Sequence, residues 1–540
     1  MYPRIFEEIS GFVEISATLG RRFRFRNYNS GMQNLAVRIL LLACLATCLP
    51  AAPRAQAEPP WVAGVRAWVA ANQQPVVREL LDLLAIPNVA ADRANVRRNA
   101  EHLRALLQKR GFAAELLETA GNPLVYGELK APGAARTLLI YCHYDGQPVD
   151  PKGWKQPDPF SPVIRRPDGT DEAPGALTPA ALTPDARIFA RSASDDKSPI
   201  VMLLAAVDAL TAAGVTPSSN IRVVLDGEEE AGSPSLVPAI DKYRDRLAAD
   251  LMVILDGPQH PSGRPTIAYG ARGIARVDVT VFGPRAGVHS GNYGNWIPNP
   301  AQRLARLLAS MKDDDGRILV DGWNDGIATL TAEEEAMLAA VPEDSAAMLR
   351  AFGVAAPEAA YPKLQDAMQY PTLNVRGLAS SFVGAGARTI IPDSATASID
   401  IRLVKETTAR TMIDKIRAHV RQQGYHIVEG PPDDATRARH SRIARLTTFG
   451  DGTNAFRTSP ADPQARALAA SIRGVRGVEP VRLRTLGGTV PIAPFIEKLG
   501  FPAVLVPTVN FDNNQHEENE NLRIQNLFEG ILTVAAILKM

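Results

Sequence analysis

Histidines and carboxylates recur in this 540-residue sequence at points where a predicted strand or loop ends. His143 and Asp256 each follow an apolar run that we predict to be a strand, and His516 lies in a polar loop near the C-terminus. Asp195 stands just before a predicted helix, which it could simply cap. Imidazole and carboxylate groups bind divalent cations, and one carboxylate can bridge two of them through its two oxygens. With a Glu from the acidic run at 226–230, these residues form a set suited to two divalent cations.

The spacing within two of these motifs suggests a division of roles. His143 and Asp145 are two residues apart, so on an extended chain they face the same way, and Asp145 can accept the second ring N–H of a metal-bound imidazole. The run 226–230 holds four acids, which are costly to bury without a counter-charge. A solvated loop would explain this run as well. In a metal site, adjacent Glu side chains point in different directions, so that one can ligate while its neighbour transfers a proton.

The elements that would position these residues alternate between strands and helices. Such alternation predicts an α/β sheet that is largely parallel and covered by helices on both faces. In a sheet of this kind the carboxyl ends of the strands line the ligand crevice. The predicted strands are 114–118, 122–127, 137–142, 221–226 and 251–255, and the predicted helices are 61–69, 75–86, 96–110, 197–213 and 234–247.

The pattern changes near residue 274, where one-sided strands begin. These strands (277–282, 372–378, 395–403 and 425–428) and two helices (300–311 and 406–423) predict a smaller two-layer α/β domain. After it the first pattern resumes, with helices at 462–473, 490–499 and 520–538 and strands at 481–485 and 502–507. We therefore predict a catalytic domain in two segments, 58–273 and 437–540, interrupted by an inserted domain at 274–436. The Pro-rich stretch 157–185 is predicted to be a surface loop.

Residues 1–57 have the pattern of a leader and signal peptide. The apolar run 39–49 is shorter than the roughly 20 residues that span a bilayer. Arg38 precedes it, and Ala55-Gln56-Ala57 provides a small-residue cleavage site. We expect cleavage near Ala57 and a periplasmic or secreted mature protein without a stable membrane span. Whether the chain starts at Met1 or Met32, and whether Cys44 carries a lipid, stay open.

Composition excludes some classes of partner and of cross-link. The 59 basic and 58 acidic residues balance, so no strong electrostatic field favours nucleic acid. The mature chain would keep only Cys142 of the three cysteines, so no internal disulfide is expected. We expect Cys142 to be a buried structural thiol.

A series of motifs in fixed order carries a family resemblance. The motifs are Glu79–Pro87, His143-Tyr144-Asp145, Ser194–Lys197, Asp226–Ser233, Asp256, Tyr269–Gly273, Val288–Gly291, Thr389–Pro392, Ile401–Leu403, Gly487–Pro491 and His516. From about residue 79 to its end, the chain resembles the dinuclear zinc peptidases of the carnosinase, aminoacylase and carboxypeptidase G superfamily. It most resembles the carnosinase-like dipeptidases.

The resemblance implies which residues hold the metals. Asp195 would bridge two ions, with His143 and Asp256 completing one site and Glu230 and His516 completing the other. Two Zn²⁺ per subunit are expected, and Mn²⁺ or Co²⁺ are alternatives that such ligands also accept.

The resemblance also implies catalytic and substrate-binding residues. Glu229 would be the general base that activates water, and Asp145 would orient His143. The inserted domain would act as a lid that supplies His289 and Arg402 to the substrate, and such lids pair into homodimers in which His289 reaches the partner's site. Looser substrate contacts are implied at Thr389, Gly488 and Thr489.

The sequence departs from the family pattern near the bridging ligand. Ala190, Ser192 and Ser198 stand where the family usually has Gly, and Asp226 replaces a Glu. A positive φ at such a position would cost a Ser free energy, so we expect the turn before Asp195 to differ in detail.

The expected function is that of an exported metal-dependent hydrolase which cleaves the amide bond of dipeptides or small peptides. An N-acyl-amino-acid deacylase with the same metals and base is an alternative. A non-catalytic peptide-binding protein on the same scaffold is a further alternative, but binding alone would need no general base.

Overall fold

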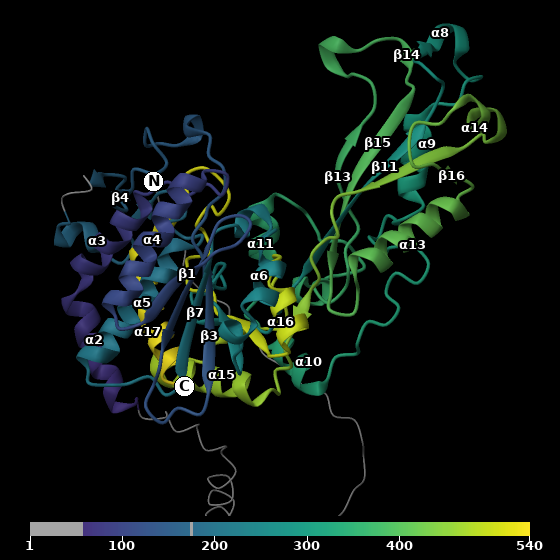
Figure 1. Cartoon of the computed structure of the whole chain (residues 1–540). Coiled ribbons are helices and arrows are strands. Elements are labelled where there is room, and N and C mark those ends of the chain that lie inside the picture. Colours follow the sequence, from purple (N-terminus) through teal and green to yellow (C-terminus); the bar gives the residue numbers. More distant parts are fainter. Residues whose placement is uncertain (1–57, 173–176) are drawn as a thin grey trace, which may run out of the picture. The chain divides into compact units, whose positions relative to one another are not determined.

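The computed structural model describes residues 58–172 and 177–540, and its largest sheet has eight strands (Figure 1). In sheet order these are β1 (Ala113–Leu117), β2 (Leu124–Leu129), β7 (Asn220–Asp226), β3 (Thr137–His143), β8 (Leu251–Ile254), β20 (Ala503–Leu505), β9 (Thr266–Ala268) and β19 (Val481–Leu483). The central run from β7 through β3 and β8 to β20 is parallel, as is the pair β9 and β19. The mostly parallel α/β sheet predicted from the sequence is confirmed.

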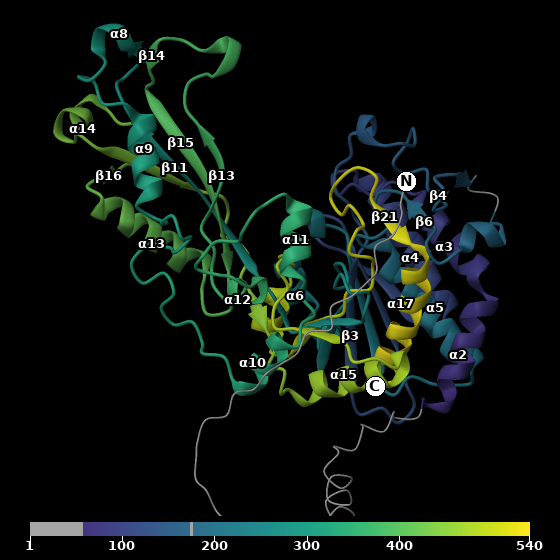
Figure 2. The ribbon, with the colours of Figure 1, turned by 180° about the vertical axis from the view of Figure 1, so that it is seen from behind.

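Strand β3 is buried on both faces of this sheet. Leu138, Ile140 and Cys142 belong to one apolar core, whereas Leu139 and Tyr141 belong to the other, as the two-residue period of a strand requires. On the first face Figure 2 shows α17 beside α5, and these two helices are in contact. The helices of the first core include α2 (Pro60–Ala71), α3 (Gln73–Leu84), α4 (Arg93–Lys109), α5 (Lys197–Ala212), α15 (Pro463–Arg476) and α17 (Ile524–Leu538), and those of the second include α6 (Leu236–Lys242) and α16 (Ala493–Leu499).

A second sheet of five strands is built mainly from the predicted insertion. Its order is β13 (Asn374–Ala379), β15 (Ser394–Leu403), β11 (Gly273–Phe282), β17 (Ile443–Thr448) and β16 (His426–Ile427). Alternate residues of β15 are buried, and they pack with residues of α9 (Pro300–Ala309) and α13 (Ala409–Gln422) in one apolar cluster. The helices therefore cover one face of this sheet (Figure 1), and the polar residues of β15 lie on the other face.

The limits of this second domain differ from those predicted. Its sheet extends beyond residue 436, because β17 pairs with β11 along six residues. Within the insertion, α10 (Ala332–Ala339) packs against the catalytic domain, where the Arg484 guanidinium donates to the Glu334 carboxylate at 2.6 Å. A switch in strand pattern marks a change of sheet, but it does not reveal a helix that returns to the first domain.

Two local predictions were wrong in detail. The helix predicted at 234–247 is two short helices, α6 and α7 (Arg244–Leu247), which meet at Tyr243. The stretch 157–185 is not only a loop, because it contributes two short strands to a four-stranded sheet. That sheet consists of β21 (Asn521–Arg523), β6 (Arg187–Phe189), β4 (Val163–Arg165) and β5 (Asp171–Glu172). Strands of two or three residues leave no measurable alternation in a sequence.

The predicted signal segment, 1–57, lies outside the described residues. Among the residues that are described, no helix is both long enough and apolar enough to cross a membrane.

Candidate metal centre

The five predicted ligands come together in two groups that share Asp195. One group is His143, Asp195 and Asp256, and the other is Asp195, Glu230 and His516. Within each group the candidate donor atoms lie within 4.8 Å of one another. Two imidazoles and three carboxylates, with one carboxylate common to both groups, are a donor set that fits two neighbouring divalent cations.

His143 is placed by the end of β3 and held by two carboxylates. It is the last residue of the strand and is buried, with Nε2 2.9 Å from Oδ1 of Asp195 and Nδ1 3.4 Å from Oδ1 of Asp145. The Asp145 carboxylate also accepts hydrogen bonds from the backbone N–H groups of Glu229, at 3.1 Å, and Glu230, at 3.0 Å. Asp145 thus fixes the imidazole and the acidic turn relative to each other.

The acidic run divides into a structural half and a half that faces the site. Asp226 ends β7 and accepts hydrogen bonds from Ser233 Oγ at 2.6 Å and from the Glu228 backbone N–H at 3.0 Å. The Glu228 carboxylate accepts the Asn122 backbone N–H at 2.8 Å. Glu229 and Glu230 begin the next short turn, and both line the adjoining cleft. A simple solvated loop therefore does not describe this run.

The loop that carries Asp195 is fixed by one buried carboxylate, Glu520. Its Oε1 accepts the backbone N–H groups of Ser194, at 2.9 Å, and Asp195, at 3.0 Å, together with the Ser194 hydroxyl at 2.9 Å. Its Oε2 accepts the Ser192 N–H and the Arg191 guanidinium, both at 2.9 Å. Sequence reasoning missed this residue, because nothing in the acidic stretch 517–520 distinguishes the buried Glu from its exposed neighbours.

The position where Ser replaces a family Gly does adopt the left-handed conformation. Ser192 has a φ of 63°. Its hydroxyl accepts a hydrogen bond from the Asn88 amide at 2.9 Å, and its backbone N–H is held by Glu520, so local contacts offset the conformational cost. Ser198 lies in the first turn of α5, outside the positive-φ region.

The second metal group is completed by a loop near the C-terminus. His516 has a φ of 66°, and its Nε2 lies 3.0 Å from Oδ2 of Asp195 and 3.5 Å from Oε2 of Glu230. Two amides that sequence reasoning missed also donate to these oxygens: Gln515 to Asp195 at 2.6 Å and Gln147 to Glu230 at 2.7 Å. Their side chains orient the carboxylates from the open side.

The buried, clustered carboxylates of the site bind protons more tightly than free carboxylates do, and the same negative charge favours bound cations. Burial raises the pKa of Asp256 to about 6 and that of Glu230 to about 8. The hydrogen bond to Asp195 raises the pKa of His516 to about 9. Burial, with the charges of Asp256 and Glu230, also raises the pKa of Glu229 well above its usual value. Positive charge is therefore stabilised at this place, in keeping with the donor set.

A cleft of about 580 Å³ opens over the candidate ligands. Glu229 lines it, and its carboxylate has no hydrogen-bond partner among the residues described. Arg402 of β15 lines the same cleft and donates from Nη1 to the Thr489 hydroxyl at 2.8 Å, beside Gly488. Three of the predicted substrate contacts thus share one cavity with four of the five predicted metal ligands.

His289 and Thr389 lie together elsewhere. They stand at β12 (Val288–His289) and beside β14 (Ile390–Ile391), where the Ser290 backbone N–H donates to the Thr389 carbonyl at 3.0 Å. Neither residue lines the cleft. His289 is exposed, and its Nδ1 accepts the Gly291 N–H at 3.0 Å. The chain does not bring these two residues to its own ligands.

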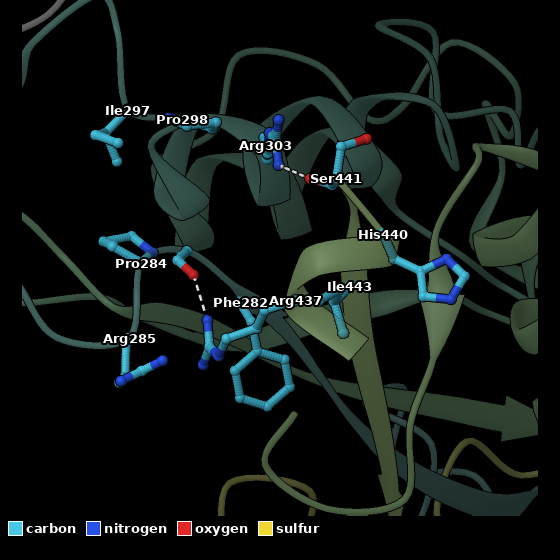
Figure 3. A pocket seen from close by; sticks show the side chains of 11 residues that line it. Phe282, Pro284, Arg285, Ile297, Pro298, Arg303, Arg437, His440, Ser441 and Ile443 are labelled. Atoms are coloured by element: carbon cyan, nitrogen blue, oxygen red, sulfur yellow. Dashed lines mark hydrogen bonds between the residues drawn. The ribbon is translucent and has the colours of Figure 1, made fainter. Parts of the chain in front are cut away.

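A second cavity of about 310 Å³ lies in the lid and has a different character (Figure 3). Two of its arginines are engaged by the backbone: Arg303 donates to the Ser441 carbonyl, and Arg437 donates to the Gly283 carbonyl at 2.7 Å. No carboxylate lines this cavity. Arg303 and Arg437 thus hold neighbouring loops of the lid together.

Comparisons with known proteins agree with this geometry. Residues 139–540 match the model of peptidase family M20/M25/M40. The human Beta-Ala-His dipeptidase is 28% identical over 491 residues, which are 88% of this chain and 89% of the relative. The Cys-Gly metallodipeptidase of Saccharomyces cerevisiae is 28% identical over 424 residues, which are 77% of this chain and 82% of the relative.

Solved structures show the same fold. An M20 family metallo-carboxypeptidase from Sulfolobus solfataricus superposes with a TM-score of 0.70 at 29% identity, covering 86% of this chain and 98% of that structure. Human carnosine dipeptidase 1 gives a TM-score of 0.68 at 26% identity, covering 89% and 98%. The predicted resemblance is thereby confirmed, and the chain belongs to peptidase family M20/M25/M40 and is a metallopeptidase.

Proposed function

We propose that this protein is a dinuclear metal-dependent dipeptidase, which hydrolyses the amide bond of dipeptides or small peptides. The observation that supports it most is the pair of ligand groups sharing Asp195, with the unpartnered Glu229 carboxylate in the same cleft. Two cations held by these groups would polarise the scissile carbonyl and lower the pKa of a water molecule. Zn²⁺ suits the His and carboxylate ligands, with Mn²⁺ or Co²⁺ as alternatives.

Glu229 is the general base in this proposal. Its backbone N–H is fixed by Asp145, while its carboxylate is free to take a proton from water and to pass it to the leaving amine. Asp145 positions the His143 ring from the side opposite Asp195. The two adjacent acids of the turn thus have separate tasks: Glu230 ligates and Glu229 transfers protons.

Substrate binding is assigned to the wall of the cleft opposite the ligands. The planar guanidinium of Arg402, oriented by Thr489, suits a two-pronged contact with the carboxylate of a peptide C-terminus. Gly488 leaves the turn beside it without a side chain, so a substrate can approach the backbone. A volume of about 580 Å³ lies within the usual range for small-molecule sites.

His289 is proposed to act in the site of a second subunit, with Thr389 beside it. Both lie outside the cleft of their own chain, and His289 is exposed. Strand β13, at the edge of the lid sheet, is exposed along all six residues, and such an edge offers unpaired backbone groups to a second copy. These features support a homodimer that pairs through the lid and exchanges His289.

Export remains a proposal from the sequence of residues 1–57. Expression from Met32 should give a product outside the cytoplasm whose first residue is Glu58. N-terminal sequencing of the product checks this, and a cytoplasmic product that retains residues 40–49 would refute it.

A hydrolysis screen tests the proposed activity. Purified protein loaded with Zn²⁺, Mn²⁺ or Co²⁺ is incubated with matched dipeptides and N-acyl amino acids, and the released amine is measured. We expect the dipeptides to be cleaved with the higher kcat/KM. Cleavage of the N-acyl amino acids alone would replace the proposal with a deacylase, and cleavage of neither class would refute hydrolysis of these amides.

A further inference from the structure

The wall of the cleft carries a second arginine, Arg276, that the proposed mechanism does not use. It lies on β11, is exposed and lines the cavity that holds the ligands and Arg402. Among the described residues its guanidinium has no hydrogen-bond or ion-pair partner. Arg402, by contrast, is already hydrogen-bonded to Thr489.

Strand pairing places the two arginines on the same face of the lid sheet. In the antiparallel register Arg402 lies opposite Ile274, and Arg276 follows Ile274 by two residues. Arg276 and Arg402 are therefore diagonal neighbours, with Cα atoms about 7–8 Å apart. Two flexible side chains at this separation can grip two carboxylates of one small molecule.

The residue that would ordinarily neutralise Arg276 has another partner. Asp400 lies directly opposite Arg276 in the register, where opposite charges usually pair. Its carboxylate instead accepts the Asn374 amide at 2.7 Å, and no ion pair forms with Arg276. The guanidinium is left facing the cleft.

A third arginine, Arg272, directly precedes β11 but does not line the cleft. Arg272 is buried, and burial, followed by the positive charge of Arg402, lowers its pKa to about 10. Its Nη2 donates to the Tyr370 carbonyl, so this contact leaves the carboxylates of the cleft unpaired with Arg272. The carboxylates of the cleft belong instead to the acidic turn and the metal ligands.

We propose that Arg276 selects substrates whose C-terminal residue is acidic. Arg402 would take the α-carboxylate, and Arg276 would take the side-chain carboxylate of a C-terminal Asp or Glu. This inference rests on the proposed dipeptidase function and names its preferred class of substrate.

Matched dipeptides separate charge recognition from shape. Alanyl-glutamate and alanyl-glutamine differ only in a carboxylate and an amide of the same size, so the ratio of their kcat/KM values measures recognition of charge. A charge-assisted contact at a partly exposed site should give a ratio on the order of tenfold in favour of alanyl-glutamate. Arg276→Gln should bring this ratio close to one. Arg276→Glu should reverse the preference, so that alanyl-lysine becomes the better substrate.

A control removes the same charge from the lid outside the cleft. Arg421 is exposed on α13 and does not line the cavity, so Arg421→Gln should keep the wild-type ratio. A wild-type ratio of one, or an Arg276→Gln ratio equal to that of wild type, would overturn the inference while leaving the dipeptidase proposal standing. If the metal-loaded wild type cleaves other dipeptides of the screen but none of these three, the inference alone is overturned; if it cleaves no dipeptide at all, the proposed function fails and this inference fails with it.

Discussion

Replacing Glu520 with Gln should destabilise the loop that presents Asp195. The Glu520 side chain is fully buried, and its Oε2 accepts the Ser192 N–H and the Arg191 guanidinium. In Glu520→Gln the side chain keeps only one carbonyl oxygen. The NH₂ group takes the place of Oε2 and faces two donors, the Ser192 N–H and the Arg191 guanidinium. Each buried donor left without a partner costs roughly 1–3 kcal/mol.

The loss of the buried ion pair with Arg191 gives a similar figure. Removing one member of such a pair costs about 3–5 kcal/mol because the other charge stays buried. The two energies describe the same contacts and are not added. We therefore expect the free energy of unfolding of metal-free protein to fall by about 3–5 kcal/mol. Urea unfolding followed by circular dichroism measures this. Isothermal titration should also show weaker metal binding, because the loop that carries Asp195 loses its contacts from Ser192 and Arg191 to Oε2.

Glu518→Gln is the matched control, because Glu518 is exposed in the same loop and its carboxylate accepts no hydrogen bond among the described residues. This variant should unfold at the same urea concentration as wild type. If Glu520→Gln does so too, the hydrogen bonds drawn to Glu520 do not stabilise the loop, and the reasoning is refuted.

Three further predictions concern the base, the pH dependence and the subunit interface. Glu229→Gln should keep its metals by elemental analysis but lose about 10²–10⁴-fold in kcat, which is the usual contribution of a general base. Glu230→Gln should instead lose metal. Near wild-type turnover of Glu229→Gln would show that another group is the base. Burial raises the pKa of Glu230 from 4.5 to about 8 and that of Asp256 from 3.8 to about 6. The folded metal-free protein therefore binds protons more tightly than the unfolded chain, and its free energy of unfolding falls as the pH rises from 5 to about 8. The increase in melting temperature on adding metal should therefore grow over this range, and an increase that shrinks would contradict the assignment. Mixing Glu229→Gln with His289→Ala should regenerate activity through hybrid dimers, in which one site has both an intact base and an intact donated His; no recovery despite verified subunit exchange would exclude His289 from the partner's site.

The grouping of the ligands could be predicted because strand ends share an edge of the sheet. His143 ends β3, and Asp256 lies two residues beyond β8, which pairs with it in parallel. Asp195 and His516 lie on loops, and for these the ordered series of motifs supplied what local pattern could not. Their roles as ligands stay predictions until metal is measured.

The contacts that support the ligands could not be predicted. Glu520 holds residues more than 300 positions away in the chain, and an acid in a polar loop has no periodicity that reveals burial. Gln147 and Gln515 are hidden for the same reason. The lid boundary was missed because β17 follows its sheet partners after a helix and a loop. Long-range contacts of this kind appear only when the fold is assembled.

Metal content measured together with activity tests the central proposal most directly. Elemental analysis of purified protein should find two divalent cations per chain. Removal of both by a chelator should abolish dipeptide hydrolysis, and Zn²⁺ or Mn²⁺ should restore it in proportion to occupancy, because every proposed ligand is an Asp, Glu or His. Full hydrolytic activity in protein shown by the same analysis to contain no metal would contradict the proposal.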